Sequence, residues 1–295
     1  MRAIVTVLMG AALAAPVAAD DDVLRSAATT AATQYEFSAE DQSLLEAIQR
    51  GCFNYLWYEV GAPGKLPKHR RTTVGASTAG IGFQLSSLPI GVERGWITRE
   101  EGERRALTVL QTLRRRRDNR REGVFLHFVH ADTGAIYPEY RNEAATVDHA
   151  LLLAGALPAA TYFGGEVAAL VDRMAAETNW RDYYDDERQL INFGWEPVDH
   201  GNLHGTGRYY PSTWHVASDE ERLVYFIAVG CPTAEFAADP RDYYRLERHV
   251  KQHADDQPFV VSPTGSLFTY FFSHCWIDYR SLGADDPGRF GVDGP

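Results

Sequence analysis

Three carboxylates stand where acid–base chemistry would need them, near the starts of predicted buried helices. Glu220 lies in "SDEERLVYFIAVGCP" (218–232), where a serine and three acids precede an apolar run. Ser218 and Glu221 have the spacing of a capping box, in which the serine caps the helix and the glutamate returns the bond. The box accounts for Glu221 and leaves Glu220 as a surplus acid in the first turn.

Asp148 and Glu143 have a similar setting. Asp148 opens the apolar stretch "TVDHALLLAGAL" (146–157), and leucines follow it at helical i+3 and i+4 spacing. A buried carboxylate is costly unless it is hydrogen-bonded, so the ordinary interpretation is a helix-start acid stabilised by the helix dipole. The functional interpretation is a set of two or three carboxylates around a cleft, as glycosidases use.

Aromatic residues that could stack on sugar rings lie in predicted loops or near predicted helix ends: Trp96, Trp195, Tyr209, Tyr210 and Trp214. The segment 200–214 is rich in Gly, His and Tyr and directly precedes the Glu220 helix, which favours a cleft loop over a plain connector. Histidines at 127, 130, 149, 204 and 274 are scattered polar candidates, although a lone histidine is more often structural than catalytic.

The elements that must position these groups alternate between two helix types. Helices that are apolar on all sides are predicted at 74–90, 146–157, 220–229 and 267–279, and amphipathic or charged helices at 41–58, 98–117, 166–178 and 241–252. The first type must be buried on every side and the second covers a core with one face. The alternation predicts an all-α toroid with an inner and an outer ring of helices; an irregular all-α globule is the alternative.

Strand patterns are few and short, at 124–129 and 259–262. The helix pattern supplies about four inner helices, fewer than a closed toroid of six pairs uses. Two interpretations stay open: the toroid is incomplete at its C-terminal end, or the chain is a truncated version of a longer one. If the inner helices run parallel, their N-termini gather at one rim, and Glu143, Asp148 and Glu220 would face a common mouth.

The N-terminus has the charged start, short apolar core and small residues of a secretory signal peptide. The predicted organisation is a signal peptide at 1–19, a flexible leader at 20–36 and one domain at 37–295. We therefore expect a periplasmic or secreted protein whose mature form does not insert into a membrane.

The formal net charge of -11 argues against nucleic acid and favours a neutral substrate. The basic run at 114–121 is the contrary feature, and we interpret it as a solvated helix end. The sequence has no metal-ligand spacing, phosphate-binding glycine loop or GxSxG motif, so we predict neither a metal nor a cofactor.

Five motifs in order resemble the glycoamylase-like domain family, which includes the endo-β-1,2-glucanases of glycoside hydrolase family 144. They are "GIGFQLSSLPIGVERGWITREEGERR" (80–105), "GVFLHFVHADTG" (123–134), "NEAATVDHALLLAGAL" (142–157), "SDEERLVYFIAVGCPT" (218–233) and "LFTYFFSHCWIDYR" (267–280). The resemblance implies an (α/α)6 barrel and inverting hydrolysis of β-glucans, typically β-1,2-linked, on an oligo- or polysaccharide substrate and without a metal.

Carried over by motif, the catalytic positions are Glu220 as the general acid, with Asp148 and Glu143 as base or substrate anchor. The substrate-binding positions are predicted to be His127, Trp96, Trp214, Tyr210, Trp276, Asp278, Arg280 and Arg70. The chain departs from the family pattern in three ways: His69 precedes Arg70 where the family has Asp, Ala145 and His149 replace hydroxyl residues, and the family barrel continues past the segment that ends at Pro295.

Three functions stay open. The first is an exported inverting β-glucan hydrolase. The second is a glucan-binding envelope protein whose catalysis is weakened or lost, because the base could lie in the continuing part of the family barrel. The third is a polysaccharide lyase on the same toroid, which would need a basic cleft for uronic acids.

Overall fold

The computed structural model describes residues 36–292 apart from 138, 141, 200 and 263, and for Arg280 it describes the backbone alone. The predicted signal peptide at 1–19, and the predicted leader except Glu36, lie outside the described residues. In this described part of the chain, no helix has both the length and the apolar character needed to cross a membrane.

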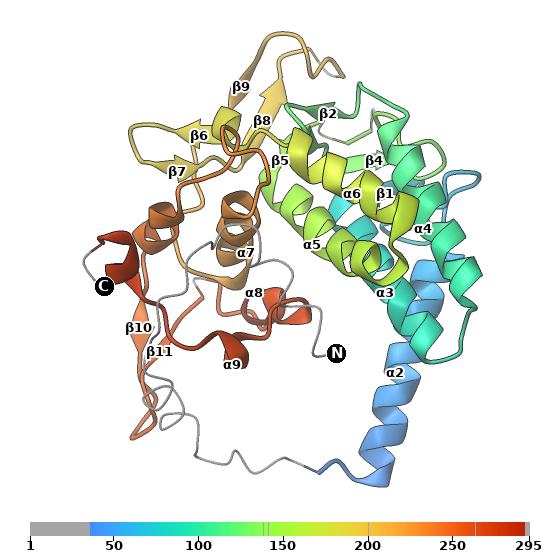
Figure 1. The fold of residues 1–295 in the computed structure, drawn as a ribbon, viewed down its shortest axis with the longest axis horizontal. Coiled ribbons are helices and arrows are strands. Elements are labelled where there is room, and N and C mark those ends of the chain that lie inside the picture. The colour runs from blue at the N-terminus through green and yellow to red at the C-terminus, as the bar shows by residue number, and fades with distance from the viewer. Residues whose placement is uncertain (1–35, 138, 141, 200, 263, 293–295) are drawn as a thin grey trace.

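The centre of the molecule is a close pair of apolar helices, α3 (Thr78–Glu93) and α5 (Thr146–Phe163). Glycines let their backbones meet: a Cβ on Gly155 would lie 2.0 Å from the carbonyl oxygen of Gly82, and a Cβ on Gly82 would lie 2.2 Å from that of Leu151. Figure 1 shows the two helices side by side. Both were predicted as buried helices, and α3 begins at Thr78 because the preceding residues are paired as a strand.

Other helices cover this pair. The helix α2 (Ala39–Tyr58) packs on α3, α4 (Arg99–Arg114) on α3 and α6, and α6 (Gly165–Glu177) on α5. A capping box of Thr98 and Glu101 opens α4. On another side of α5 lies α7 (Asp219–Val229), the predicted Glu220 helix (Figure 1). The fold is thus mostly helical, with apolar helices in the core and amphipathic ones outside.

Short antiparallel strands lead into the core helices. The strand β1 (Gly75–Ser77) pairs with β4 (Phe128–His130) and continues directly into α3. Likewise β5 (Ala144–Ala145) pairs with β8 (Gly194–Pro197), which pairs with β9 (Gly207–Tyr209), and β5 continues into α5. The remaining pairs are β2 (Arg120–Arg121) with β3 (Val124–Phe125), β6 (Tyr184–Asp185) with β7 (Leu190–Ile191), and β10 (Val250–Lys251) with β11 (Phe259–Val260). The strand signals at 124–129 and 259–262 are confirmed in part: the first is divided into β3 and β4, which belong to different pairs, and the second is a strand only at Phe259–Val260.

Two predicted helices are wrong, both in the C-terminal third. Instead of a helix at 241–252, the chain forms a 3-10 segment, η2 (Pro240–Arg245). The next residue, Leu246, is already extended. Tertiary hydrogen bonds then hold the chain, because the Glu247 N–H donates to the His215 carbonyl at 2.7 Å. Those bonds outweigh the helical propensity of the charged run.

Instead of one helix at 267–279, the chain forms α8 (Phe268–Phe271), the 3-10 turn η3 (Ser273–Cys275) and α9 (Tyr279–Leu282), followed by η4 (Pro287–Phe290). The break places Phe272 and Trp276 against Phe83, with ring centroids 5.9 and 5.0 Å away. Aromatic packing on α3 therefore decides the path of this segment.

Candidate active site

One histidine ties together the starts of α3 and α5. The His127 carbonyl accepts the N–H of Thr78, the first residue of α3, at 3.0 Å. The His127 N–H donates to the carbonyl of Glu143 at 2.9 Å, just before β5 and α5. The two predicted helix starts are therefore held at one place by backbone bonds.

The imidazole of His127 lies between two of the three predicted carboxylates. Its Nδ1 is 3.0 Å from Oε1 of Glu143, and its Nε2 is 3.6 Å from Oδ1 of Asp148. The ring stacks on Phe128 with centroids 4.2 Å apart. Because each nitrogen faces a carboxylate, the site favours the protonated imidazole, in which both nitrogens are donors.

The β8–β9 hairpin supplies the next polar groups. The Tyr210 hydroxyl donates to Oε2 of Glu143 and lies 3.2 Å from Oε2 of Glu196. Glu196 is in turn held by Arg208, whose Nε donates to it at 2.7 Å. Glu143 is thus bonded from both sides, by His127 and by Tyr210.

Trp214 anchors the predicted cleft loop to the start of α5. Its Nε1 donates to Oγ1 of Thr146 at 2.8 Å, and the Thr146 hydroxyl donates to the carbonyl of Asn192 at 2.8 Å. The Trp214 ring stacks on Phe193 with centroids 3.9 Å apart. The loop that sequence analysis singled out therefore lies at the first turn of α5.

Burial and neighbouring charges shift the pKa values of the groups at this site. Burial raises the pKa of Asp148 to about 6; the charge of His127 opposes this rise, and the charges of Glu143 and Glu220 add to it. Burial lowers the pKa of His127, but the hydrogen bond to Glu143 and the charge of Asp148 outweigh burial and leave that pKa raised. Burial alone raises the pKa of Glu220. The charge of Glu220 therefore acts on Asp148, which links the start of α7 to the start of α5.

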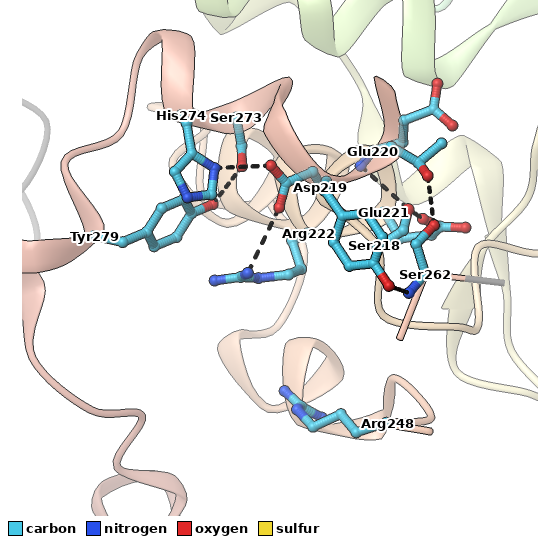
Figure 2. A network of polar contacts seen from close by, with 12 residues as sticks. Ser218, Asp219, Glu220, Glu221, Arg222, Arg248, Ser262, Ser273, His274 and Tyr279 are labelled. Atoms are coloured by element: carbon cyan, nitrogen blue, oxygen red, sulfur yellow. Dashed lines mark hydrogen bonds and ion pairs between the residues drawn. The ribbon is translucent and has the colours of Figure 1, made fainter. Parts of the chain in front are cut away.

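The start of α7 differs from the predicted capping box by one residue. The Ser218 oxygen accepts the N–H of Glu220, at 3.3 Å, and not that of Glu221. The Ser218 hydroxyl donates to the Glu221 carboxylate, and burial raises the pKa of Glu221 to about 7. Figure 2 shows Glu221 beside Ser218 and the Glu220 side chain turned away from them. Glu220 is surplus to the cap, as the sequence predicted.

Trp96 does not join this group. It follows the C-terminal end of α3, packs on Phe53 with centroids 5.1 Å apart and lies under the guanidinium of Arg50 at 4.8 Å. The 16 residues of α3 span about 24 Å, so Trp96 lies at the far end of the helix from His127. Trp96 therefore lies after a helix end, as the sequence predicted, but at the end of α3 that is distant from the acids.

The other predicted binding residues lie at several places. Arg70 is exposed in the loop before β1, and its neighbour His69 packs edge-on against Phe128 at 5.0 Å. Trp276 packs on α3, and its Nε1 is buried without a hydrogen-bond partner in the described structure. Asp278 is exposed before α9, and Arg280 lies in α9 with a side chain outside the described part.

Two aromatics that were predicted in loops or near helix ends, Trp195 and Tyr209, lie in the strands β8 and β9 and are structural. Trp195 is buried in β8 under the guanidinium of Arg121, 4.4 Å from its ring, and the Tyr209 hydroxyl donates to Asp182 at 2.7 Å. His149 is also structural, because burial lowers its pKa to about 3 and its Nε2 lies 2.9 Å from the Thr178 hydroxyl. Among the described residues, no group of three or more His, Cys, Asp or Glu side chains could hold a metal ion.

Sequence analysis missed Glu196 and Asp219. Glu196 faces Arg208 across the β8–β9 register, a pairing that no sequence pattern marked. Asp219 was visible as an acid beside Glu220, but its partner His274 lies 55 residues away in the chain. The sequence signal that could have pointed to Asp219 was the run of three adjacent acids at 219–221, because a helix cap needs only one.

Comparisons with known proteins agree with the predicted resemblance. The family model "Glycoamylase" matches residues 211–292. An exo β-1,2-glucooligosaccharide sophorohydrolase of Parabacteroides distasonis is 28% identical over 246 residues, which are 77% of this chain and 31% of that protein.

Solved structures share the fold. The endo-β-1,2-glucanase of Chitinophaga pinensis has a TM-score of 0.62 at 20% identity, over 81% of this chain and 60% of that one. A β-1,2-glucanase of Parabacteroides distasonis has a TM-score of 0.58 at 24% identity, over 72% of this chain and 30% of that one. The chain therefore spans between about a third and three fifths of the relatives it matches. The resemblance to the glycoamylase-like family, with neighbours that hydrolyse β-1,2-glucans, is confirmed.

Proposed function

We propose that the protein is an exported glycoside hydrolase that cleaves linear β-1,2-glucan with inversion. The observation that carries the proposal is the cluster at the helix starts, in which His127 faces Glu143 and Asp148, and the charge of Glu220 reaches Asp148. Glycoside hydrolysis requires two carboxyl groups that flank the scissile bond, one as proton donor and one as base. The substrate class comes from the names of the relatives, which act on β-1,2-glucan or its oligosaccharides.

We propose in addition that α2 to α7 are part of an (α/α)6 toroid. The alternation of buried helices α3, α5 and α7 with covering helices α2, α4 and α6 supports this arrangement. A toroid would bring the helix starts that carry Asp148 and Glu220 to one rim.

Glu220 is the proposed general acid. A proton donor must stay protonated at working pH, although its place in the first turn of α7 favours the anion through the helix dipole. Burial works in the opposite direction and raises its pKa. The proton would pass from Glu220 to the leaving glycosidic oxygen as the C–O bond breaks.

Asp148 is the proposed general base. Its pKa of about 6 leaves it mostly ionised at pH 7, yet basic enough to take a proton from an attacking water. Glu143 is bonded to both His127 and Tyr210, which suits an anchor better than a proton acceptor that must be free to act.

Trp214 and Tyr210 are the proposed sugar contacts nearest the acids, because both lie beside the start of α5. An indole face can stack on a pyranose ring and a phenol can hydrogen-bond a sugar hydroxyl. Arg70, Trp276, Asp278 and Arg280 remain proposed substrate-binding residues.

The test is incubation of the purified protein with linear β-1,2-glucan while reducing ends and optical rotation are measured. We expect new reducing ends whose initial anomer is inverted, and at least a 100-fold loss of rate in Glu220→Gln. The matched control is Glu235→Gln, an exposed acid in the loop after α7. Full activity in Glu220→Gln would contradict the assignment of Glu220 as the general acid.

Two other results would each replace the proposal. Binding of β-1,2-glucan without new reducing ends, unchanged in Glu220→Gln, would indicate a glucan-binding envelope protein. Ultraviolet absorbance from an unsaturated uronide, released from a polyuronate, would indicate a lyase.

A further inference from the structure

Asp219, the residue before the proposed acid, is a buried carboxylate with two partners from different parts of the chain. Its Oδ2 lies 3.0 Å from Nδ1 of His274 and its Oδ1 lies 3.6 Å from a terminal nitrogen of Arg222. The Asp219 side chain is 5% exposed, whereas that of His274 is 47% exposed. Because burial of a lone carboxylate is costly, these contacts determine where Asp219 can lie.

The partners are themselves held in place. The Arg222 guanidinium lies 4.4 Å over the ring of Tyr279, and the Tyr279 hydroxyl donates to Oγ of Ser273 at 2.8 Å. The His274 ring lies 4.9 Å from that of Tyr279. The turn at 273–279 and the first turn of α7 therefore form one polar network, which Figure 2 shows with Asp219 at its centre.

The network fixes the rotation of the first turn of α7. Successive side chains on a helix point about 100° apart, so the direction of Asp219 sets that of Glu220. The cap alone is weak for this purpose, since the Glu220 N–H reaches Ser218 at 3.3 Å and α7 has 11 residues. In Figure 2 Asp219 points toward His274 and Arg222, and Glu220 points away from them.

We propose that Asp219, held by His274 and Arg222, is a positioning residue that aims the Glu220 carboxyl at the glycosidic oxygen. The inference rests on the proposed function, with Glu220 as proton donor. Asp219 does not touch the substrate in this scheme. Its loss therefore impairs proton donation and leaves substrate binding intact.

A comparison of leaving groups tests this role. The variants are Asp219→Asn and His274→Ala, with His274→Asn as a conservative variant that keeps an N–H donor near the Nδ1 position. Misplacement of a catalytic group by about 1 Å can cost about 100-fold, so we expect kcat on linear β-1,2-glucan to fall about 10- to 100-fold with KM within about twofold. A 4-nitrophenyl β-1,2-glucooligosaccharide should be cleaved at nearly the wild-type rate, because nitrophenolate leaves without protonation. His274→Asn should recover most of the glucan activity that His274→Ala loses.

The matched control is Asp256→Asn. Asp256 also faces a histidine, His253, with Oδ2 3.4 Å from Nδ1, but both side chains are exposed. The Asp256→Asn variant should cleave both the glucan and the nitrophenyl substrate at the wild-type rate. Equal losses on glucan and on the nitrophenyl substrate in Asp219→Asn would overturn the positioning role, as would wild-type rates on both.

Backbone hydrogen exchange tests the inference without any activity. Peptides that cover 218–224 should exchange faster in Asp219→Asn and His274→Ala than in the wild type or Asp256→Asn, and those from α5 should not. If the wild type does not cleave glucan, the proposed function fails and the exchange result still decides whether Asp219 holds the turn. Unchanged exchange at 218–224 would overturn the inference even in an active enzyme.

Discussion

His127 and Glu143 are joined twice, once through the backbone and once through their side chains. The His127 N–H donates to the Glu143 carbonyl at 2.9 Å, and its Nδ1 lies 3.0 Å from the Glu143 carboxylate. The backbone bond belongs to the fold and the side-chain bond belongs to the site. A substitution at His127 can therefore remove the side-chain bond to Glu143 and retain the backbone bond.

His127→Ala should reduce activity much more than it reduces stability. The backbone bond survives the change, while Glu143 and Asp148 lose the cation between them. We expect kcat/KM on β-1,2-glucan to fall about 100-fold and the free energy of unfolding to fall by about 1–3 kcal/mol, the usual cost of leaving a buried polar partner unsatisfied. Steady-state kinetics and urea unfolding measure the two effects. His253→Ala, at an exposed histidine, is the control, and an active His127→Ala would remove His127 from the site.

The acid limb of the pH–rate profile should reflect the ionisation of Asp148. Its pKa of about 6 predicts that kcat/KM rises with pH up to about 6, as the proposed base becomes ionised. In His127→Gln the opposing charge is lost, so the pKa of Asp148 should rise and the limb should move to higher pH. A limb near pH 4 in both proteins would contradict the assignment of Asp148 as base.

Stability should fall as pH rises between about 4 and 7. Burial raises the pKa values of Asp148 and Glu221, to about 6 and about 7, so between the unfolded and folded pKa values the native state holds more protons. Raising the pH then favours the unfolded state. The raised pKa of His127 acts in the same direction, since its stabilising charge is lost at high pH. Thermal melting from pH 4 to pH 8 should show a flatter decline in Glu221→Gln than in the wild type; an equally steep decline would refute the role of Glu221.

The close approach of α3 and α5 should not tolerate a side chain at Gly155. A Cβ there would lie 2.0 Å from the backbone oxygen of Gly82, so the helices would have to separate. We expect Gly155→Ala to destabilise the protein by about 3 kcal/mol, the upper end of overpacking costs. Gly51→Ala in α2 meets nothing within 4 Å and should stabilise by about 0.5–1 kcal/mol through helix propensity. Denaturant unfolding of both variants checks the contrast, and equal effects would contradict the packing argument.

Substitutions of Trp214 and Trp96 should have different effects, the first on substrate binding and the second on stability. Trp214→Ala removes an indole that is bonded to Thr146 in the first turn of α5. It should raise KM for β-1,2-glucan about 10-fold or more, from the loss of about 1.4 kcal/mol or more of binding. Trp96→Ala removes packing against Phe53 at the far end of α3 and should lower stability with little change in KM. Kinetics and melting temperatures on both variants measure the difference, and a KM effect in Trp96→Ala would restore Trp96 to the cleft.

The sequence alone determined the helices that carry a strong local pattern. The charged run of α4 and the apolar runs of α3, α5 and α7 are local signals, and these helices begin within a few residues of their predicted starts. Glu220, Glu143 and Asp148 were identifiable because an acid at the start of a buried helix conflicts with its surroundings. Local propensity failed at 241–252 and 267–279, where bonds to His215 and packing on Phe83 decide the path.

Only the tertiary structure decided how the site is joined. His127 faces both Glu143 and Asp148, Tyr210 reaches Glu143 from a hairpin, and Asp219 meets His274 from 55 residues away. These contacts depend on how helix starts and loops converge in space, which no periodicity encodes. The same reason separates Trp214 from Trp96: both are tryptophans beside helix ends, and only the packing of α3 and α5 shows which end carries the acids.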